Sequence, residues 1–284
     1  MTSHRRPGRR HPGTLTAATA DKHWLYEHSV QNVEFECRFI ARVFQRHFGR
    51  RGPFLREDFC GTANLSCEWI RQGRDHRALG IDLHGPTLDW GRAHHVSRLG
   101  AAASRLRLVQ DDVCRVSRPR TDIVCATNFS WWVFKRREQL LGYLRNAFAS
   151  LRPEGLLLMD IYGGPEAQVA QEEERPCDGF TYVWDQASYN PITQDYRCRV
   201  HFRFPDGTER RRAFSYDWRL WSVPELRDAM REAGFAETAV YWEGSDRRGQ
   251  PSGVFRQSEI GDNASAWVAY VAGFRRPRSA AAKR

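Results

Sequence analysis

The stretch LREDFCGTANLS, residues 55–66, decides the fold. An apolar run ends in two acids, Glu57 and Asp58, a tight turn with one glycine, Gly61, follows, and a helix begins near residue 63. A strand that passes through a short turn into a helix is the repeating unit of an open parallel sheet. In such a sheet ligands bind beyond the carboxyl ends of the strands, so this turn is the first candidate site.

The same unit recurs along the first half of the chain. Apolar runs bounded by turn residues alternate with amphipathic stretches, and this alternation predicts a doubly wound α/β sheet. A helix is also expected over 23–49, where apolar residues recur at helical spacing. Strands are expected over 53–59, 77–83, 106–113, 121–129 and 156–164, with helices over 63–73, 86–100 and 136–155.

The pattern changes after residue 170. Polar and apolar residues alternate over 179–190, 195–204 and 209–221, as in an antiparallel sheet with one solvated face. A helix over 223–235 and strands over 236–243 and 264–274 follow, and the acidic QEEERP at 171–176 is interpreted as a linker. We therefore expect a ligand-binding core over 21–175, a β-rich insertion over 176–221 and the end of the core sheet over 222–274.

The formal net charge of +10 is concentrated at the two ends of the chain. Residues 1–20 contribute +4 and residues 275–284 contribute +5, and both read as disordered basic tails. The folded body is then nearly neutral, so nucleic acid is not the expected partner, although a contact between the tails and a polyanion stays open. No run of 18 apolar residues exists, and no membrane span is expected.

The cysteines and histidines indicate neither disulfides nor a metal. Seven cysteines, an odd number without a CxxC pair, are typical of reduced thiols in a cytoplasmic protein. The histidine pairs lack the spacing of metal ligands, so no metal is assigned. Cys60 is not expected to be a nucleophile, because no histidine or lysine lies near it in sequence to lower its pKa.

The turn itself indicates a nucleoside ligand without a phosphate. Gly61 allows close backbone approach, and the free N–H groups that open the next helix favour a polar group. The second strand ends in Asp82, twenty-one residues after Gly61, a spacing that suits a carboxylate bound to a ribose diol. One glycine is too few for a phosphate cradle, and no GxxxxGK[ST] motif is present.

The order of elements resembles that of the class I S-adenosyl-L-methionine (SAM)-dependent methyltransferases over residues 50–164 and the two closing strands. EDFCGTA (57–63) is similar to the family's loop of an acid followed by glycines, and QDDV (110–113) and LRPEGLLLMD (151–160) resemble two later segments. Phe59 and Ala63 stand where glycines are common. The resemblance implies a Rossmann-like seven-stranded sheet with an inserted antiparallel β-rich lid, and an enzyme that binds SAM.

The resemblance also implies which residues hold the cofactor. The acid of the loop is Glu57 or Asp58, Asp82 binds the ribose, and Asp111 or Asp112 faces the adenine amino group. The segment ATNFSW (126–131) lines the methionine end. The complete predicted cofactor-binding set is Glu57, Asp58, Cys60, Gly61, Thr62, Asp82, Leu83, Asp111, Asp112, Val113, Asn128, Phe129 and Ser130.

Two aromatic segments bear on the methyl acceptor. HWLYEHSVQ (23–31) resembles the leading segment that closes over the cofactor in small-molecule methyltransferases, with Tyr26 and Gln31 as candidate contacts; packing on the sheet is the alternative. Trp131 and Trp132, with Tyr162, would form an aromatic entrance for an amine by cation–π contact, or else a hydrophobic interface between core and lid. The catalytic candidates are Tyr26, Trp131 and Tyr162.

The β-rich insertion and the following RRAFSYDWRLWSVPELRDAMREAGF (211–235) resemble the substrate lid of the glycine and sarcosine N-methyltransferases. The resemblance therefore implies a small-molecule methyltransferase of that type, acting on nitrogen rather than oxygen. An RNA or protein methyltransferase that uses the basic tails is one alternative, and a non-catalytic SAM-binding module is another. The acceptor is not specified by the sequence, and a homodimer is left open.

Overall fold

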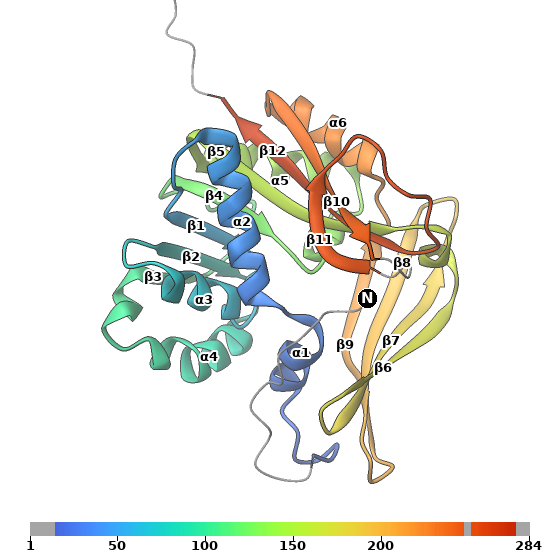
Figure 1. Ribbon diagram of the computed structural model, residues 1–284. Helices are drawn as coiled ribbons and strands as arrows, with labels where there is room; N and C mark the ends of the chain where they lie inside the picture. Colours follow the sequence, from blue (N-terminus) through green and yellow to red (C-terminus); the bar gives the residue numbers. More distant parts are fainter. Residues whose placement is uncertain (1–14, 247–250, 277–284) are drawn as a thin grey trace, which may run out of the picture.

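A large mixed sheet forms the centre of the molecule. The computed structural model describes residues 15–246 and 251–276 (Figure 1). The sheet has eight strands in the order β11-β10-β12-β5-β4-β1-β2-β3. Its parallel part comprises β1 (Phe54–Asp58), β2 (Arg77–Asp82), β3 (Leu106–Gln110), β4 (Thr121–Ala126) and β5 (Leu151–Gly163).

Three strands complete the sheet beyond β5. β12 (Trp267–Arg275) pairs antiparallel with β5 and with β10 (Glu237–Ser245), and β11 (Pro251–Gln257) pairs antiparallel with β10. The predicted count of seven strands is therefore one short. The additional strand, β11, forms between the strands expected over 236–243 and 264–274, and it covers the edge of β10 that would otherwise lie unpaired.

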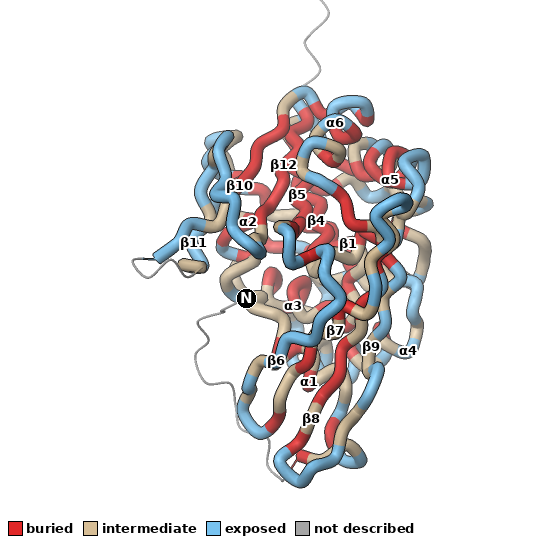
Figure 2. Tube along the Cα trace, turned by 90° about the vertical axis from the view of Figure 1, so that its right-hand side faces the viewer, coloured by how far each residue is buried: buried red, intermediate tan, exposed pale blue. Residues whose placement is uncertain are grey.

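Helices cover both faces of the sheet. α2 (Val33–Phe48) and α3 (Asn64–Gln72) bury their apolar sides against one face, and α5 (Arg137–Ser150) and α6 (Val223–Ala233) against the other. α4 (Gly85–His94) follows β2. Figure 2 shows that the buried residues follow the central strands of this sheet. The predicted α/β class, with strands and helices alternating, is confirmed.

The single helix expected over 23–49 is two helices. α1 (Lys22–Val30) begins at Asp21, whose side chain accepts hydrogen bonds from the backbone N–H groups of His23 and Trp24. α2 begins after Asn32, whose side chain accepts from the backbone N–H of Phe35. Because Asn32 caps a new helix, the chain turns between Val30 and Val33, and α1 leaves the face of the sheet that α2 covers (Figure 1).

The β-rich insertion is a separate four-stranded antiparallel sheet. Its strands are β6 (Gln171–Cys177), β7 (Phe180–Tyr189), β8 (Asp195–Arg203) and β9 (Glu209–Arg219), in that spatial order. The segment 171–176, interpreted as a linker, is the edge strand β6, so this sheet begins five residues before the predicted boundary at 176. Arg203 on β8 explains the difference, because its guanidinium pairs with Glu172 and Glu174 of the acidic strand.

Parts of the two expected tails are ordered. Leu15 and Ala20 are buried, and the backbone N–H of Ala17 donates to Thr208 Oγ1 in the insertion at 3.0 Å. Arg275 is the last residue of β12 and donates to the carbonyl oxygens of Phe148 and Leu151. The remaining residues of the expected tails, 1–14 and 277–284, lie outside the described residues. Within residues 15–246 and 251–276, no helix is both long and apolar enough to cross a membrane.

Candidate functional site

The turns after β1, β2, β3 and β4 lie together at one edge of the sheet. Asp58 at the end of β1 is level with Ile81 on β2 and with Ala126 on β4. The chain moves outward from β1 through β2 to β3 and then returns to β4 on the other side of β1, so β1 and β4 flank the switch in strand order. This switch is where open α/β sheets bind ligands, and the predicted site residues cluster around it.

The turn after β1 has an unusual backbone. Phe59, Gly61 and Ala63 all have positive φ, at 57°, 54° and 57°. A residue with a side chain adopts this conformation at a cost of roughly 1–2 kcal/mol. Phe59 and Ala63, the two departures from the glycine pattern, therefore adopt the left-handed conformation that glycine would adopt without strain. Such strain persists where the surroundings hold the chain in place, and it is found most often at functional sites.

Asp82 links the turns after β1 and β2. Its Oδ2 accepts from the backbone N–H of Gly61 at 2.8 Å, and its Oδ1 accepts from the backbone N–H of His84 at 2.8 Å. Each carboxylate oxygen can accept a second hydrogen bond, so two hydroxyl groups could still bind here. The neighbouring Leu83 is 67% exposed and presents an apolar side chain at the same edge.

The two acids after β3 shape their own turn. Asp111 donates its backbone N–H to the carbonyl of Asp82 and accepts from the N–H of Asp112, whose side chain accepts from the N–H of Cys114. Val113 is buried, and its carbonyl accepts from Arg56 and Asn146. Asp111 and Asp112 thus lie beside Asp82, whereas Val113 contributes its backbone to the core.

Glu57 and Asp58 point to opposite sides of β1. Glu57 Oε2 accepts from both the backbone N–H and the hydroxyl of Ser66 on α3, at 2.9 and 2.5 Å, and burial raises the pKa of Glu57 to about 8. Asp58 instead pairs with the buried Arg56 at 2.6 Å and accepts from Tyr143 on α5. Asp58 is therefore part of the core under α5, whereas Glu57 lies on the side of α3.

Cys60 is a packed residue of the same turn. Its backbone N–H donates to the carbonyl of Ile81 at 3.0 Å, and its side chain lies against Gly80. Burial raises the pKa of Cys60 well above its ordinary value, which suits an inert thiol. All seven cysteines are free thiols.

The turn after β4 is held by an acid that the sequence did not single out. Asp160 on β5 accepts from the backbone N–H groups of Asn128 and Phe129, at 2.6 and 2.9 Å, and both of these residues have positive φ. Burial raises the pKa of Asp160 to about 8. One signal could have revealed this residue, namely an acid inside the apolar strand LLLMDIY. Ser130 completes the turn by donating to the carbonyl of Thr127.

The aromatic entrance expected at Trp131 and Trp132 is a packed interface. Both side chains are 0% exposed, and Trp131 Nε1 donates to the carbonyl of Asp160 at 2.7 Å. The ring of Trp132 lies edge-on to Trp218 of the insertion, with centroids 5.7 Å apart. The hydroxyl of Tyr162 is hydrogen-bonded to Tyr196. The alternative reading, a hydrophobic interface between core and insertion, is therefore correct for the two tryptophans.

A cavity of about 530 Å³ opens beside this interface, at the same edge of the sheet. It lies beyond the ends of β5 and β10 and the start of β12, next to the first turn of α6. Five aromatic side chains line it together with polar groups of the segment 258–263. The aromatic lining comprises Tyr162, Tyr189, Trp221, Trp242 and Trp267.

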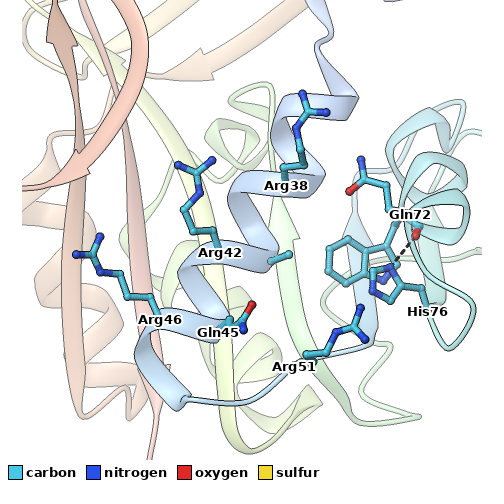
Figure 3. Close-up of a pocket in the computed structure, with 10 residues that line it drawn as sticks. Arg38, Arg42, Gln45, Arg46, Arg51, Gln72 and His76 are labelled. Atoms are coloured by element: carbon cyan, nitrogen blue, oxygen red, sulfur yellow. Dashed lines mark hydrogen bonds between the residues drawn. The ribbon is translucent and has the colours of Figure 1, made fainter.

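A second hollow of about 520 Å³ lies at the opposite edge of the sheet (Figure 3). It is lined by residues of α2 and by segments that precede β1 and β2, including four arginines. In Figure 3 Arg42 and Arg46 point away from Arg51 and His76 rather than toward a common centre. Because its position is remote from the strained turns, this hollow is not part of the candidate site.

α1 contacts both the strained turn and the insertion. The ring of Tyr26 lies against Phe214 of β9, and burial raises the pKa of Tyr26. Gln31 accepts from Asn64 at the start of α3 at 2.9 Å. Glu27, which the sequence did not single out, accepts from the hydroxyl of Thr62 at 2.5 Å. α1 thus contacts the turn and the start of α3 through Glu27 and Gln31, whereas Tyr26 faces the insertion, and closure over the cofactor stays a prediction.

One cluster in the insertion has the composition of a metal site. Glu172, Asp185 and His201 bring a ligand atom each within 4.8 Å of one another. However, His201 Nδ1 accepts the backbone N–H of Arg212 at 2.6 Å, so in the neutral ring Nε2 carries the proton and donates to Asp185. The same Asp185 pairs with Arg199. This arrangement satisfies the three side chains by hydrogen bonds and ion pairs.

Solved structures with the same arrangement of elements include several methyltransferases. A SAM-dependent methyltransferase from Clostridium acetobutylicum is 12% identical, with a TM-score of 0.64 over 88% of this chain and 96% of that one. The sugar N-methyltransferase KedS8 from a Streptoalloteichus species is 19% identical, with a TM-score of 0.59 over 97% and 100% of the two chains. CalS10, a SAM-bound amino pentose methyltransferase from Micromonospora echinaspora, is 15% identical, with a TM-score of 0.61 over 89% and 95%.

Sequence comparison adds no closer relationship. No family model matches the chain, and no curated protein matches it. Likeness to structures at such low identity establishes architecture alone. The strand order, the inserted antiparallel sheet and these structural matches together show that this chain has the fold of the class I SAM-dependent methyltransferases.

Proposed function

We propose that this protein is a SAM-dependent methyltransferase that methylates a nitrogen atom of a small molecule. The observation that carries the proposal is the hydrogen bond from the backbone N–H of Gly61 to the carboxylate of Asp82, beside the switch in strand order and next to Asp111 and Asp112. This group offers a strained turn for close approach and free carboxylate lone pairs for hydroxyl groups. The SAM-bound structure of the same fold supports the choice of cofactor.

The residues of the candidate site suit the separate parts of SAM. Asp82 would accept the ribose hydroxyls, Leu83 would contact the adenine ring, and Asp111 or Asp112 would accept from the adenine amino group. Gly61 and Thr62 form the turn beneath the nucleoside, and Glu57 supplies negative charge near the cationic methionine end. No phosphate-binding motif competes with this assignment.

SAM carries a methyl group on a sulfonium, which is a good leaving group in an in-line displacement. The protein therefore acts chiefly by aligning the acceptor and excluding water, and alignment can contribute up to about 7–11 kcal/mol. Asp160 holds the turn at Asn128 and Phe129, between the cofactor turns and the cavity beyond β5. Its buried position makes it a determinant of where that turn lies.

The cavity beyond β5 is the proposed place for the body of the acceptor. Its aromatic lining, with Tyr189, Trp242 and Trp267, suits an amine or a ring, whose cationic or C–H groups interact favourably with aromatic faces. Structural neighbours include sugar and glycopeptide N-methyltransferases, and this favours nitrogen as the methylated atom. We propose a small-molecule amine as the acceptor class.

Calorimetry tests the cofactor assignment directly. SAM and S-adenosylhomocysteine should bind with micromolar affinity, whereas NADH and ATP should not bind. Methyl transfer from labelled SAM to a panel of small amines then tests the acceptor class. A folded protein that binds neither SAM nor S-adenosylhomocysteine would contradict the proposal. SAM binding without methyl transfer to any acceptor would favour a non-catalytic SAM-binding module.

A further inference from the structure

The two sides of α1 have different chemistry. The side toward the insertion is apolar: Leu25 is buried in one cluster with Phe180 and Val200 of β7 and β8. The ring of Tyr26 packs against Phe214 of β9, with centroids 4.9 Å apart. The helix is thereby attached to the insertion by hydrophobic contacts, although Val30 at the end of α1 and Gln171 at the start of β6 are 141 positions apart in sequence.

The side of α1 that faces the α/β core is polar. Glu27 Oε1 accepts from the hydroxyl of Thr62 and lies 2.7 Å from Nε2 of His95, directly after α4. Asp21 at the start of α1 accepts from Trp90 Nε1 on α4 at 3.0 Å. Polar contacts of this kind lose little when water replaces them, whereas the separation of apolar surfaces costs free energy in proportion to their area. The contact of α1 with the core therefore depends chiefly on the side chains of Glu27 and Asp21.

Thr62 is the point at which α1 supports the strained turn. It lies between Gly61 and Ala63, both with positive φ. On its other side α4 approaches so closely that a side chain at Gly91 would overlap the Thr62 carbonyl oxygen. The turn is thus enclosed by α4 on one side and by the Glu27 carboxylate on the other, and both Glu27 and Thr62 are buried.

We infer that Glu27 is a positioning residue that holds the turn 59–63 in its ligand-binding conformation when α1 and the insertion are docked on the core. The Glu27 carboxylate then couples the docking of α1 and the insertion to the conformation of the turn 59–63. This inference rests on the proposed function, because it takes SAM as the ligand of the turn. The coupling itself, between α1 and the turn, does not depend on the identity of the ligand.

The test compares Glu27→Gln with a matched control, Glu34→Gln, which alters an exposed glutamate on α2 paired with Arg38. Hydrogen exchange of the amides of residues 59–66 and SAM affinity are measured for both variants. We expect faster exchange in the turn and roughly tenfold weaker SAM binding for Glu27→Gln, the effect of replacing a charged hydrogen bond by a neutral one. Glu34→Gln should match the wild type in both measurements.

A second variant separates positioning from general stability. Phe214→Ala loosens the insertion side of α1, and it should weaken SAM binding in the wild-type background but add little in the Glu27→Gln background, because the coupling is already lost. Additive effects would overturn the inference, as would unchanged exchange in the turn of Glu27→Gln. If Glu27→Gln fails to fold, Thr62→Val removes the hydrogen bond to Glu27 altogether while Glu27 keeps His95, and the same criteria apply.

The exchange measurement also distinguishes this inference from the proposed function. If the wild-type protein binds no SAM, the cofactor assignment fails, yet faster exchange of residues 59–66 in Glu27→Gln would still support the positioning role. If SAM binds and the exchange of the turn is unchanged, the cofactor assignment stands and the role of Glu27 is rejected.

Discussion

At the end of β1 two adjacent acids serve different purposes. Glu57 accepts from Ser66 on the side of α3, whereas Asp58 compensates the charge of Arg56 under α5. Neighbouring residues on a strand point to opposite faces, so the two side chains enter different environments. The pKa of Glu57 near 8 implies that its carboxyl group is largely protonated at neutral pH in the free protein.

Glu57 should make SAM binding depend on pH. A cationic ligand favours the ionised carboxylate, so binding lowers the pKa of Glu57 and releases a proton below about pH 8. Affinity should increase as the pH rises toward 8 and level off above it. Calorimetry in buffers of different ionisation enthalpy measures the number of protons released when SAM binds. Glu57→Gln should abolish the proton release that comes from Glu57. An unchanged release in that variant would contradict the assignment.

Asp82 should contribute to SAM affinity both directly and through Gly61. Asp82→Ala removes the proposed acceptors for the ribose and the one for the Gly61 N–H, so binding should weaken by roughly 1–3 kcal/mol. Asp89→Ala on α4, an exposed residue paired with Arg92, is the control and should bind SAM normally. Wild-type affinity in Asp82→Ala would exclude the ribose assignment.

At the scale of elements, the buried guanidinium of Arg56 joins β1, the segment after β3 and α5. Arg56 on β1 donates to the carbonyls of Val113 and Val116 after β3 and to Ser150 at the end of α5, besides its pair with Asp58. Its side chain is fully buried. The segment that carries Asp111 and Asp112 is thereby fixed relative to β1.

Arg56→Met should destabilise the protein by about 3–5 kcal/mol, because it leaves Asp58 as an uncompensated buried charge. The double variant Arg56→Met/Asp58→Leu should recover part of this loss. Chemical denaturation measures the free energy of unfolding of the single and the double variant. Arg77→Met, at an exposed position of β2, is the control. Equal stability of Arg56→Met and the control would show that the pair has no structural role.

Trp131→Ala should act on stability rather than on the choice of acceptor. The side chain is fully buried and bonded to the carbonyl of Asp160, so its removal should cost about 3–5 kcal/mol. Val133→Ala, in the same turn (η2, Ser130–Val133) but 46% exposed, should have little effect. A stable Trp131→Ala protein with altered acceptor use would restore Trp131 to the acceptor site.

The elements that could be predicted from the sequence are those with a local signal. β1 to β5 and their helices follow from apolar periodicity, and Asp82 follows from its distance to Gly61. β6 could not be predicted, since its acids are compensated by Arg203, about thirty residues later. Glu27 and Asp160 were missed for the same reason, because their partners at Thr62 and Asn128 are brought close only by the tertiary fold.

At the scale of the whole molecule, the candidate site lies at the edge of the eight-stranded sheet where the turns after β1 to β4 meet, and the predicted basic tails are not part of it. Removal of residues 1–14 and 277–284 should leave methyl transfer to a small amine, and its dependence on salt, unchanged. A methyltransferase that held RNA by these segments would instead lose activity, most strongly at low salt, because contacts with phosphates are electrostatic. Assays of the truncated protein at two salt concentrations decide between the two.

The docking of the N-terminal segment on the insertion also affects how the protein is made. Ala17 is bonded to Thr208, and Leu15 and Leu25 are buried with residues of β7 and β8. At about 5–20 residues per second, translation reaches the insertion roughly 10–40 s after these leucines leave the ribosome. During that interval the residues of β7 and β8 that cover their apolar surface are not yet in the nascent chain, so we expect a chaperone to bind this segment.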